Sequence, residues 1–373
     1  MEDLLAQLPQ QVLNGLTLGA IYALIALGYS MVYGVLQLLN FAHGDVFMIG
    51  SFVGFFILDA FVPQLRESFS LGMSIFVISL MLIASMGVCG FLGVIIEQFA
   101  YRPLRNAPRI APLISALGVS FFIQNAVLLV LGGDRRNYAR NFVIPPQFRV
   151  ENGDFFMFGG VLVISAIVIG LLASGAYIGR KNNRLLNDAS RLMGVLSISI
   201  AVAGALLMIA PFGGRMVLSA SRIVAIASAI LLMAVLWALV RRTRIGAAMR
   251  AVATDQEAAA MMGVDVDRVV MFTFFIGSAL AGAAGVLNGL VLGQVYHFIG
   301  FNAGLKGFIA AVIGGIGNIP GAMLGGLLLG IVEAFAQGFI SSTFQDVIVF
   351  LALIVVLLLR PSGLLGARIA QKV

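Results

Sequence analysis

The sequence predicts an all-α integral membrane protein, a bundle of about 10–11 transmembrane helices that includes one short broken or re-entrant segment. Of its 373 residues, 61% are hydrophobic and only 10% are charged, whereas soluble domains carry about 25% charged residues. A spanning helix needs roughly 20 apolar residues, and several stretches are that long. These runs are continuous rather than alternating, as barrel strands would be, so the spans are expected to be helices.

Ten candidate spans follow one another, each an apolar run that ends at polar or charged residues. A further apolar piece, 305–317, is too short to cross a bilayer comfortably at about 1.5 Å per residue. We expect it to be a broken or re-entrant helix that neighbouring protein buries. All of these segments are assigned to a single transmembrane domain over 1–373. The ten spans are 11–33, 43–62, 71–96, 111–131, 157–178, 192–210, 221–240, 269–293, 321–340 and 345–360.

Basic loops predict the orientation of the bundle, because lysine and arginine are enriched in loops that stay in the cytoplasm. The loops 98–110, 179–191 and 241–268 and the C-terminal tail hold 15 of the 23 basic residues. Placing them inside puts the N-terminus outside and alternates correctly through eight spans. The tail then lies inside only if the 305–317 piece crosses or the number of spans changes. The net charge of +7 is therefore attributed to these loops and not to nucleic-acid binding.

The 44 glycines recur at a spacing of four residues, which places them on one face of a helix and lets backbones approach closely. Helix packing is the first interpretation of this pattern. The second is that the run GGIGNIPGAMLGG, 314–326, unwinds a helix to line a substrate path, as interrupted helices do in transporters. The spaced sets are Gly15/Gly19, Gly50/Gly54, Gly285/Gly289/Gly293, Gly321/Gly325 and Gly326/Gly330.

Catalytic and metal-binding motifs are absent from the sequence. There is no GxxxxGK[ST] phosphate loop and no HExxH motif, and the chain has only two histidines, so we expect no ATPase site, no metal site and no bound cofactor. Carboxylates within apolar runs mark pathways in ion-coupled carriers. Glu333 is the one expected near a midplane, with either a structural or a pathway role; the other three, Asp45, Glu97 and Asp346, are expected near span ends.

A polar segment, RAVATDQEAAAMMGVDVDRV at 250–269, lies between two apolar runs, 223–240 and 269–292. Thr254 with Glu257 three residues on predicts a capping box, and Asp255 and Glu257 suit the positive end of the helix dipole. Gly263 is expected to end the helix in a left-handed cap. The short helix 254–263 would present Ala258, Met261 and Met262 on one face, either to a partner's groove or to the membrane surface.

At this point the sequence resembles a family. The EAAAMMG stretch fits the E-A-A-x-x-x-G loop of ABC importer permeases. Residues 14–50, 241–269, 300–334 and 359–366 are similar to branched-chain amino-acid ABC transporter permeases of the LivH type. Two departures stand out: the I-x-L-P element that follows the glycine in the longer consensus is missing, as is common in that branch, and 155–212 resembles an insertion that carries two extra spans.

The resemblance implies a permease subunit of the bacterial inner membrane, a single permease domain with a cytoplasmic coupling loop at 241–268. Its partners would be a second related permease, two cytoplasmic ABC ATPases, a periplasmic substrate-binding protein and membrane lipid. ATP would be used by the partners, and branched-chain amino acids (leucine, isoleucine, valine) would cross by alternating access. Urea or short-chain amide import and an ion-coupled secondary carrier remain alternatives. The coupling residues would be Asp255, Glu257, Ala258, Ala259 and Gly263; polarity or flexibility in apolar surroundings makes Asn40, His43, Asn302, Gly317 and Glu333 candidates for the path.

Overall fold

The computed structural model describes residues 2–67, 70–105, 107–108, 110–139 and 219–366. The two spans predicted within 155–212, and the insertion that they would form, lie outside these ranges. The chain divides into two compact units, one made of 1–13 and 148–219 and the other of 14–147 and 220–373. The features below belong to the second unit.

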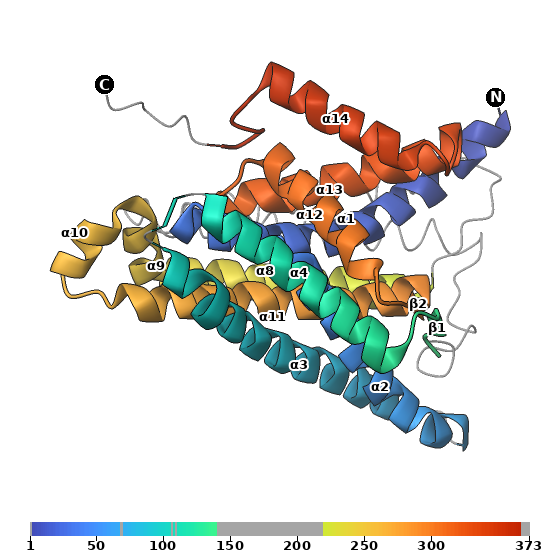
Figure 1. The fold of residues 1–373 in the computed structure, drawn as a ribbon. Helices are drawn as coiled ribbons and strands as arrows, with labels where there is room; N and C mark the ends of the chain where they lie inside the picture. The colour runs from blue at the N-terminus through green and yellow to red at the C-terminus, as the bar shows by residue number, and fades with distance from the viewer. Residues whose placement is uncertain (1, 68–69, 106, 109, 140–218, 367–373) are drawn as a thin grey trace, which may run out of the picture. The chain divides into compact units, whose positions relative to one another are not determined.

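Nearly all of the described chain is helical (Figure 1). Within the described ranges, seven helices are long and apolar enough to cross a membrane, and α12 and α14 are shorter apolar helices. Their bounds match the predicted spans to within about five residues, except that α1 begins nine residues before the predicted span 11–33 and that α12 differs from the 305–317 piece. The elements are α1 (Glu2–Leu36), α2 (His43–Glu67), α3 (Leu71–Ile96) with a π turn (Glu97–Tyr101) and a 3-10 turn (Arg102–Leu104), α4 (Ile110–Leu131), β1 (Arg136–Asn137), α8 (Ala220–Arg242), α9 (Arg244–Thr254), α10 (Gln256–Met261), α11 (Val266–Leu292), β2 (Gln294–Val295), α12 (Ile299–Gly314), α13 (Ile319–Phe335) with a π turn (Ala336–Ile340), and α14 (Gln345–Leu359).

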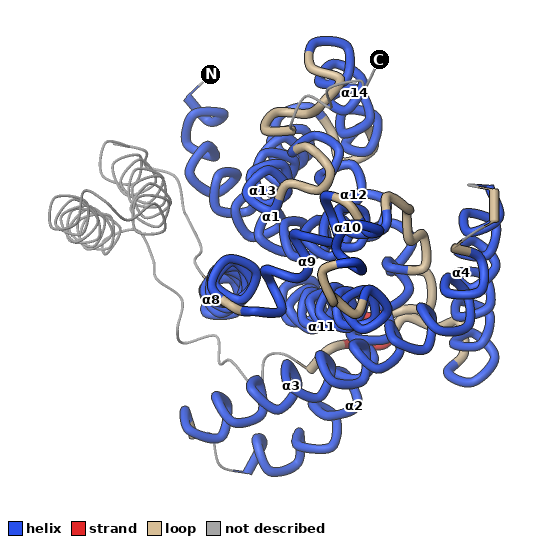
Figure 2. Tube along the Cα trace, turned by 90° about the vertical axis from the view of Figure 1, so that its left-hand side faces the viewer, coloured by secondary structure: helices blue, strands red, loops and turns tan. Residues whose placement is uncertain are grey.

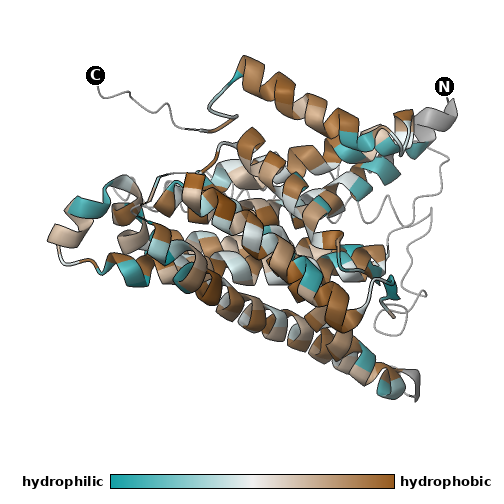
Figure 3. Ribbon diagram, viewed as in Figure 1, coloured by the Kyte–Doolittle hydropathy of each residue, from teal (hydrophilic) through white to brown (hydrophobic). Residues whose placement is uncertain are grey.

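The helix ends gather at two opposite levels, which Figure 1 shows as the α10 end and the β1–β2 end. At the α10 end, Gln256 at the start of α10 bonds to Val35 near the end of α1. Gly34 there lies against Gly317 in the turn between α12 and α13. At the other end, β1 pairs antiparallel with β2, which joins α11 to α12. Figure 3 shows hydrophilic residues mainly near these ends and hydrophobic ones along the helices between them.

The prediction for 305–317 is wrong in extent, because α12 begins at Ile299 and ends at Gly314. Its 16 residues span about 24 Å and carry the chain from the β2 end to the α10 end. The polar Asn302, just before the predicted piece, made the run look shorter than it is. α12, α13 and α14 run alternately between the two ends, so the C-terminal turn lies at the α10 end together with α9 and α10. The basic residues predict that this end is cytoplasmic.

The most deeply buried spans are α1 and α11: 89% and 78% of their most apolar stretches are inside the protein, against 28% for α4 and α8. Figure 2 shows α11 lying between α8 on one side and α4 on the other. Lipid tails are as apolar as leucine, so close packing must hold such a helix in place. The glycine spacing provides it: a Cβ at Gly50 of α2 would lie 2.5 Å from the Cα of Gly282 of α11.

Ser85 of α3 joins three helices at this crossing. Its hydroxyl lies 2.8 Å from the carbonyl oxygen of Gly282 and 3.2 Å from that of Gly50, so it donates to either one. One turn further along α3, the Cys89 thiol donates to the carbonyl of Val46 at 3.3 Å. The glycine pattern is therefore used for packing, as the first interpretation predicted, and α2, α3 and α11 form one tightly crossed group.

Tyr138, which follows β1, fills the space left by two of the spaced glycines. A Cβ at Gly289 would lie 2.5 Å from its ring, and a Cβ at Gly54 would collide with its hydroxyl. The hydroxyl donates to the carbonyl of Ser51 at 2.9 Å. Burial raises the pKa of the Tyr138 phenol, so the hydroxyl stays protonated and donates at neutral pH. Tyr138 therefore fixes the β1 segment against α2 and α11.

Replacing Gly282 by leucine is expected to destabilise the bundle severely. A Cβ there would lie 2.8 Å from both the Cys89 Cβ and the Ser85 carbonyl oxygen, and overpacking of this kind costs typically about 1–3 kcal/mol or more. Gly87→Leu is the matched control, because Gly87 is exposed on α3 and a Cβ there meets nothing within 4 Å. Thermal unfolding in mild detergent should show a large loss for Gly282→Leu alone; equal melting temperatures would contradict the packing described.

Candidate functional site

The polar segment at 250–269 forms two helices, α9 and α10, joined at Asp255. Asp255 has an extended backbone (φ −159°, ψ 113°), and its carboxylate accepts from the N–H of Ala258 at 3.0 Å. The predicted capping box is wrong, because Thr254 is the last residue of α9 and its hydroxyl donates back to the carbonyl of Arg250. Asp255 is therefore the cap of α10, and Glu257 follows in its first turn, where its charge suits the helix dipole.

The predicted left-handed cap at the end of α10 is present. Gly263 adopts φ +85°, a left-handed conformation that only glycine takes without strain. Ala258, Met261 and Met262 are exposed, the two methionines at 83% and 85%. Ala259 is buried at 5%, so this coupling candidate packs inward and cannot contact a partner directly. α10 therefore carries a small, compact apolar face that its own chain leaves uncovered.

Two polar connections attach α10 to the bundle. The Gln256 amide donates to the carbonyl of Val35 at 2.9 Å. Asp267, in the first turn of α11, pairs with Arg102 and with Arg105, the latter at 2.5 Å. Arg105 also pairs with Glu97, whose side chain is only 2% exposed. The end of α1 is thus held to α10 itself, and the end of α3 is held to the start of α11, the helix that follows α10.

Segment 37–42 turns back into the bundle between α1 and α2. Gln37, at φ +55°, reverses the chain after α1, and α2 then starts at His43, whose ring lies 4.6 Å from that of Tyr29. Tyr29 is about two turns back from the end of α1, so the segment descends roughly 10 Å. Non-helical backbone at such depth is tolerated where protein buries it, and Asn40 and Ala42 are buried. This brings the candidates Asn40 and His43 together.

The residues around the start of α2 form a buried polar cluster: Asn40, His43, Asp45, Tyr101 and Gln124. The Tyr101 hydroxyl lies 3.1 Å from Asn40 Oδ1 and 3.2 Å from the carbonyl of Leu39. The Gln124 amide of α4 donates to Asp45 at 2.9 Å. Asp45 was expected near a span end, but α2 begins inside the bundle, so its first turn lies inside as well. Within the described chain, neither His43 nitrogen has a well-formed hydrogen bond.

Glu333 lies in a different place, in an ion cluster between α12, α13 and α14. Lys306 Nζ lies 2.6 Å from Glu333 Oε1 and 2.9 Å from Asp346 Oδ1. The Glu333 side chain is 5% exposed and that of Asp346 62%. A buried carboxylate needs such a partner, which gives Glu333 a structural explanation. Asn302 is exposed in the first turn of α12, and the structure does not bring it to Asn40 and His43.

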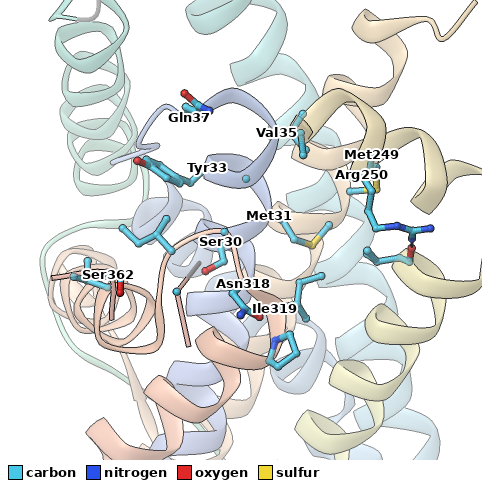
Figure 4. A pocket seen from close by; sticks show the side chains of 18 of the residues that line it. Ser30, Met31, Tyr33, Val35, Gln37, Met249, Arg250, Asn318, Ile319 and Ser362 are labelled. Carbon is cyan, nitrogen blue, oxygen red and sulfur yellow. Dashed lines mark hydrogen bonds between the residues drawn. The ribbon is translucent and has the colours of Figure 1, made fainter. Parts of the chain in front are cut away.

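A cavity of about 800 Å³ opens at the α10 end. It lies between the end of α1, α9, the α12–α13 turn and the C-terminal turn, and Figure 4 shows Ser30, Tyr33, Asn318 and Ser362 around it. Gly317 lines it, with φ +85°, so the unwinding predicted for 314–326 is confined to the short turn between Gly314 and Ile319. Of the five path candidates, only Gly317 reaches this cavity.

Sequence reasoning missed several polar side chains of these sites, among them Tyr101, Gln124, Gln256 and Lys306. Lys306 had a signal, because an ionisable residue within an apolar run is a functional candidate by default. Tyr101 and Gln124 lack one, since their partners Asn40 and Asp45 lie 61 and 79 residues away in the sequence. Within the described residues, no group of three His, Cys, Asp or Glu side chains is placed to hold a metal ion.

Comparisons with known proteins follow this geometry. Residues 11–358 match the family described as "Branched-chain amino acid transport system / permease component". The permease protein LivH of the high-affinity branched-chain amino acid transport system of Salmonella typhimurium is 39% identical over 98% of this chain and 97% of its own length. BraD of Pseudomonas aeruginosa, of the same description, is 38% identical with the same coverage.

A more distant relative is a probable branched-chain amino acid transport permease protein LivH of Methanocaldococcus jannaschii, 26% identical over 92% of this chain and 88% of its own. No solved structure gives a significant match. The family match covers most of the chain, including both the α9–α10 segment and the buried polar cluster. This multi-pass membrane protein therefore belongs to the family of permease components of branched-chain amino acid transport systems.

Proposed function

We propose that this chain is the permease subunit of an ABC importer in the bacterial inner membrane, and that it moves leucine, isoleucine and valine by alternating access. The observation that carries the proposal is α10, a capped helix beyond the apolar spans with an exposed alanine and methionine face. Methionine side chains adapt to a groove, and an amphipathic helix laid in a groove is a recurrent mode of recognition. The relatives' names supply the substrate class.

The proposed assembly contains a second related permease, two cytoplasmic ABC ATPases and a periplasmic binding protein. The sequence has no phosphate loop of its own, so ATP is bound and hydrolysed by the ATPase partners. ATP binding closes these subunits and brings the two coupling helices together. Because α10 is bonded to α1 through Gln256 and continues into α11, whose Asp267 pairs with Arg105 beyond α3, its displacement rocks the spans. Substrate delivered by the binding protein then crosses between the two permeases.

An ion-coupled carrier is the alternative from a different class, and it would use Glu333. The geometry favours the importer over this alternative, since Glu333 is already paired with Lys306 at 2.6 Å. Import of urea or a short-chain amide would require the same α10, so α10 does not discriminate between substrates. The binding protein is expected to make that selection.

If the chain is an importer permease, transport by purified components should depend on ATP and on the binding protein. Proteoliposomes that hold the complete complex should take up leucine only with ATP inside and the binding protein outside. An ionophore that collapses ion gradients should leave uptake unchanged, and the chain alone should not transport. Excess isoleucine or valine should compete with leucine, whereas urea and acetamide should not. Uptake by the chain alone on an ion gradient, abolished by Glu333→Gln, would replace the importer with the carrier.

Replacing Gly263 by valine should weaken ATPase binding. A β-branched side chain at φ +85° costs about 1–2 kcal/mol. To relieve this strain the backbone at the end of α10 should distort and displace Met261 and Met262. Gly132→Val is the matched control, because Gly132 has nearly the same conformation, φ +84°, at the opposite end of the bundle. Co-purification with the ATPases should fall for Gly263→Val and stay normal for Gly132→Val. Normal ATPase binding by both variants, and by Glu257→Lys, would exclude α10 as the docking helix.

A further inference from the structure

Segment 37–42 is held by two polar side chains. One, Gln256, belongs to α10, and the other, Tyr101, is linked to α11, the helix that follows α10. Before the segment, the carbonyl of Val35 accepts a hydrogen bond from Gln256 of α10 at 2.9 Å. Within it, Leu39 and Asn40 share the Tyr101 hydroxyl at 3.2 Å and 3.1 Å. Residues 37–40 lie outside the helices, although the Gln37 N–H still bonds to the Tyr33 carbonyl at 2.7 Å, so the segment is softer than the helices that it joins.

Tyr101 is connected to the α10 side through an ion network. Asp267 lies in the first turn of α11, four residues after Gly263, and binds Arg105 at 2.5 Å. Arg105 pairs in turn with Glu97. Glu97 and Tyr101 are the first and last residues of one π turn that continues α3. A shift of the start of α11 therefore acts on the π turn that carries Tyr101.

The energetics of this network favour a role beyond stability. Burying a carboxylate such as Glu97 costs desolvation free energy, and the attraction within its ion pair offsets only part of that cost. Buried ion pairs are therefore weak evidence for stability. Single π turns within α-helices are rare and occur frequently at functional sites. Arg105, whose side chain is 17% exposed, joins the buried Glu97 to Asp267, which is about half exposed. The network thus runs from the surface beside α10 into the interior.

We infer that segment 37–42 transmits displacement of α10 to the buried polar cluster, with Gln256 and Tyr101 as the positioning residues. The inference rests on the proposed function, since it takes α10 as the ATPase contact. Movement of α10 displaces Val35 directly and displaces Asn40 through Asp267, Arg105 and the π turn. Because Asn40 and the start of α2 are continuous in the chain, the displacement reaches His43 and Asp45.

Spin labels on the complete complex test this relay. Cys89 is the single cysteine of the chain and is fully buried, so Gln37→Cys and Ala251→Cys, both at exposed positions, can be labelled one at a time. The Ala251 label on α9 reports the coupling side, and the Gln37 label reports the segment. In the unmodified complex, ATP should change both spectra.

Tyr101→Phe keeps the ring, which packs 5.2 Å from that of Phe274, and removes only the hydroxyl. It should leave ATPase binding and the ATP response at Ala251 intact, while the ATP-responsive population at Gln37 falls by up to about tenfold, the effect of one buried hydrogen bond; the response that remains is the part carried by the bond from Gln256 to Val35. Tyr138→Phe is the matched control, because it removes a buried hydroxyl bonded to the Ser51 carbonyl at the other end. It should leave both responses normal.

Asp267→Asn, at a half-exposed side chain, breaks the same relay at its surface end and should also reduce the Gln37 response. An unchanged Gln37 response in both Tyr101→Phe and Asp267→Asn, with a normal response at Ala251, overturns the relay and leaves the importer standing. Failure of ATP to change either label in an unmodified complex with bound ATPases overturns the coupling role of α10 and the relay with it.

Discussion

Direct contact between helix backbones is the constraint on which this structure depends. In lipid, no hydrophobic force draws apolar helices together, so packing and interhelical hydrogen bonds must do so. At Gly50 and Gly282 the backbones of α2 and α11 touch, and the Ser85 hydroxyl reaches both carbonyls from α3. The same device joins α1 to α13, where a Cβ at Gly19 would lie 2.8 Å from the Cα of Leu327. Helices packed in this way move as rigid groups.

The flexible parts of the bundle are then the short non-helical connections between helices, which we call joints, and polar side chains concentrate at them. Segment 37–42 joins α1 to α2, Asp255 joins α9 to α10, and the turn after Gly314 joins α12 to α13. Each joint carries a side chain that bonds to backbone or to another helix: Asn40 with Tyr101, Asp255 with its own helix, and Asn318 with the carbonyl of Leu365 at 2.6 Å. A transporter that alternates between two states needs this division between rigid groups and defined joints.

The sequence predicted helices wherever an apolar run ends at charged residues, because the bilayer imposes both the length and the polarity of a span. It misjudged the extent of α12, since Asn302 interrupts the apolar run. It also missed the role of Lys306, because the partners Glu333 and Asp346 come from two later helices. It placed the cap of α10 at Thr254 because nothing in the residues shows that α9 runs directly into α10. The bond from Gln256 to Val35 joins residues 221 positions apart, and no local pattern encodes such a contact.

The length of α14 has a consequence for the surrounding bilayer. Its 15 residues reach about 22 Å, whereas the hydrocarbon core is about 30 Å thick. Charged Asp346 and Arg360 stand at its two ends, and along its sides only Val349 is buried. The mismatch is met by local thinning of the membrane or by contact with another subunit. The acyl-chain length of the host membrane should thus influence how α14 sits in the bilayer. Through Asp346 it should also influence the ion cluster with Lys306 and Glu333.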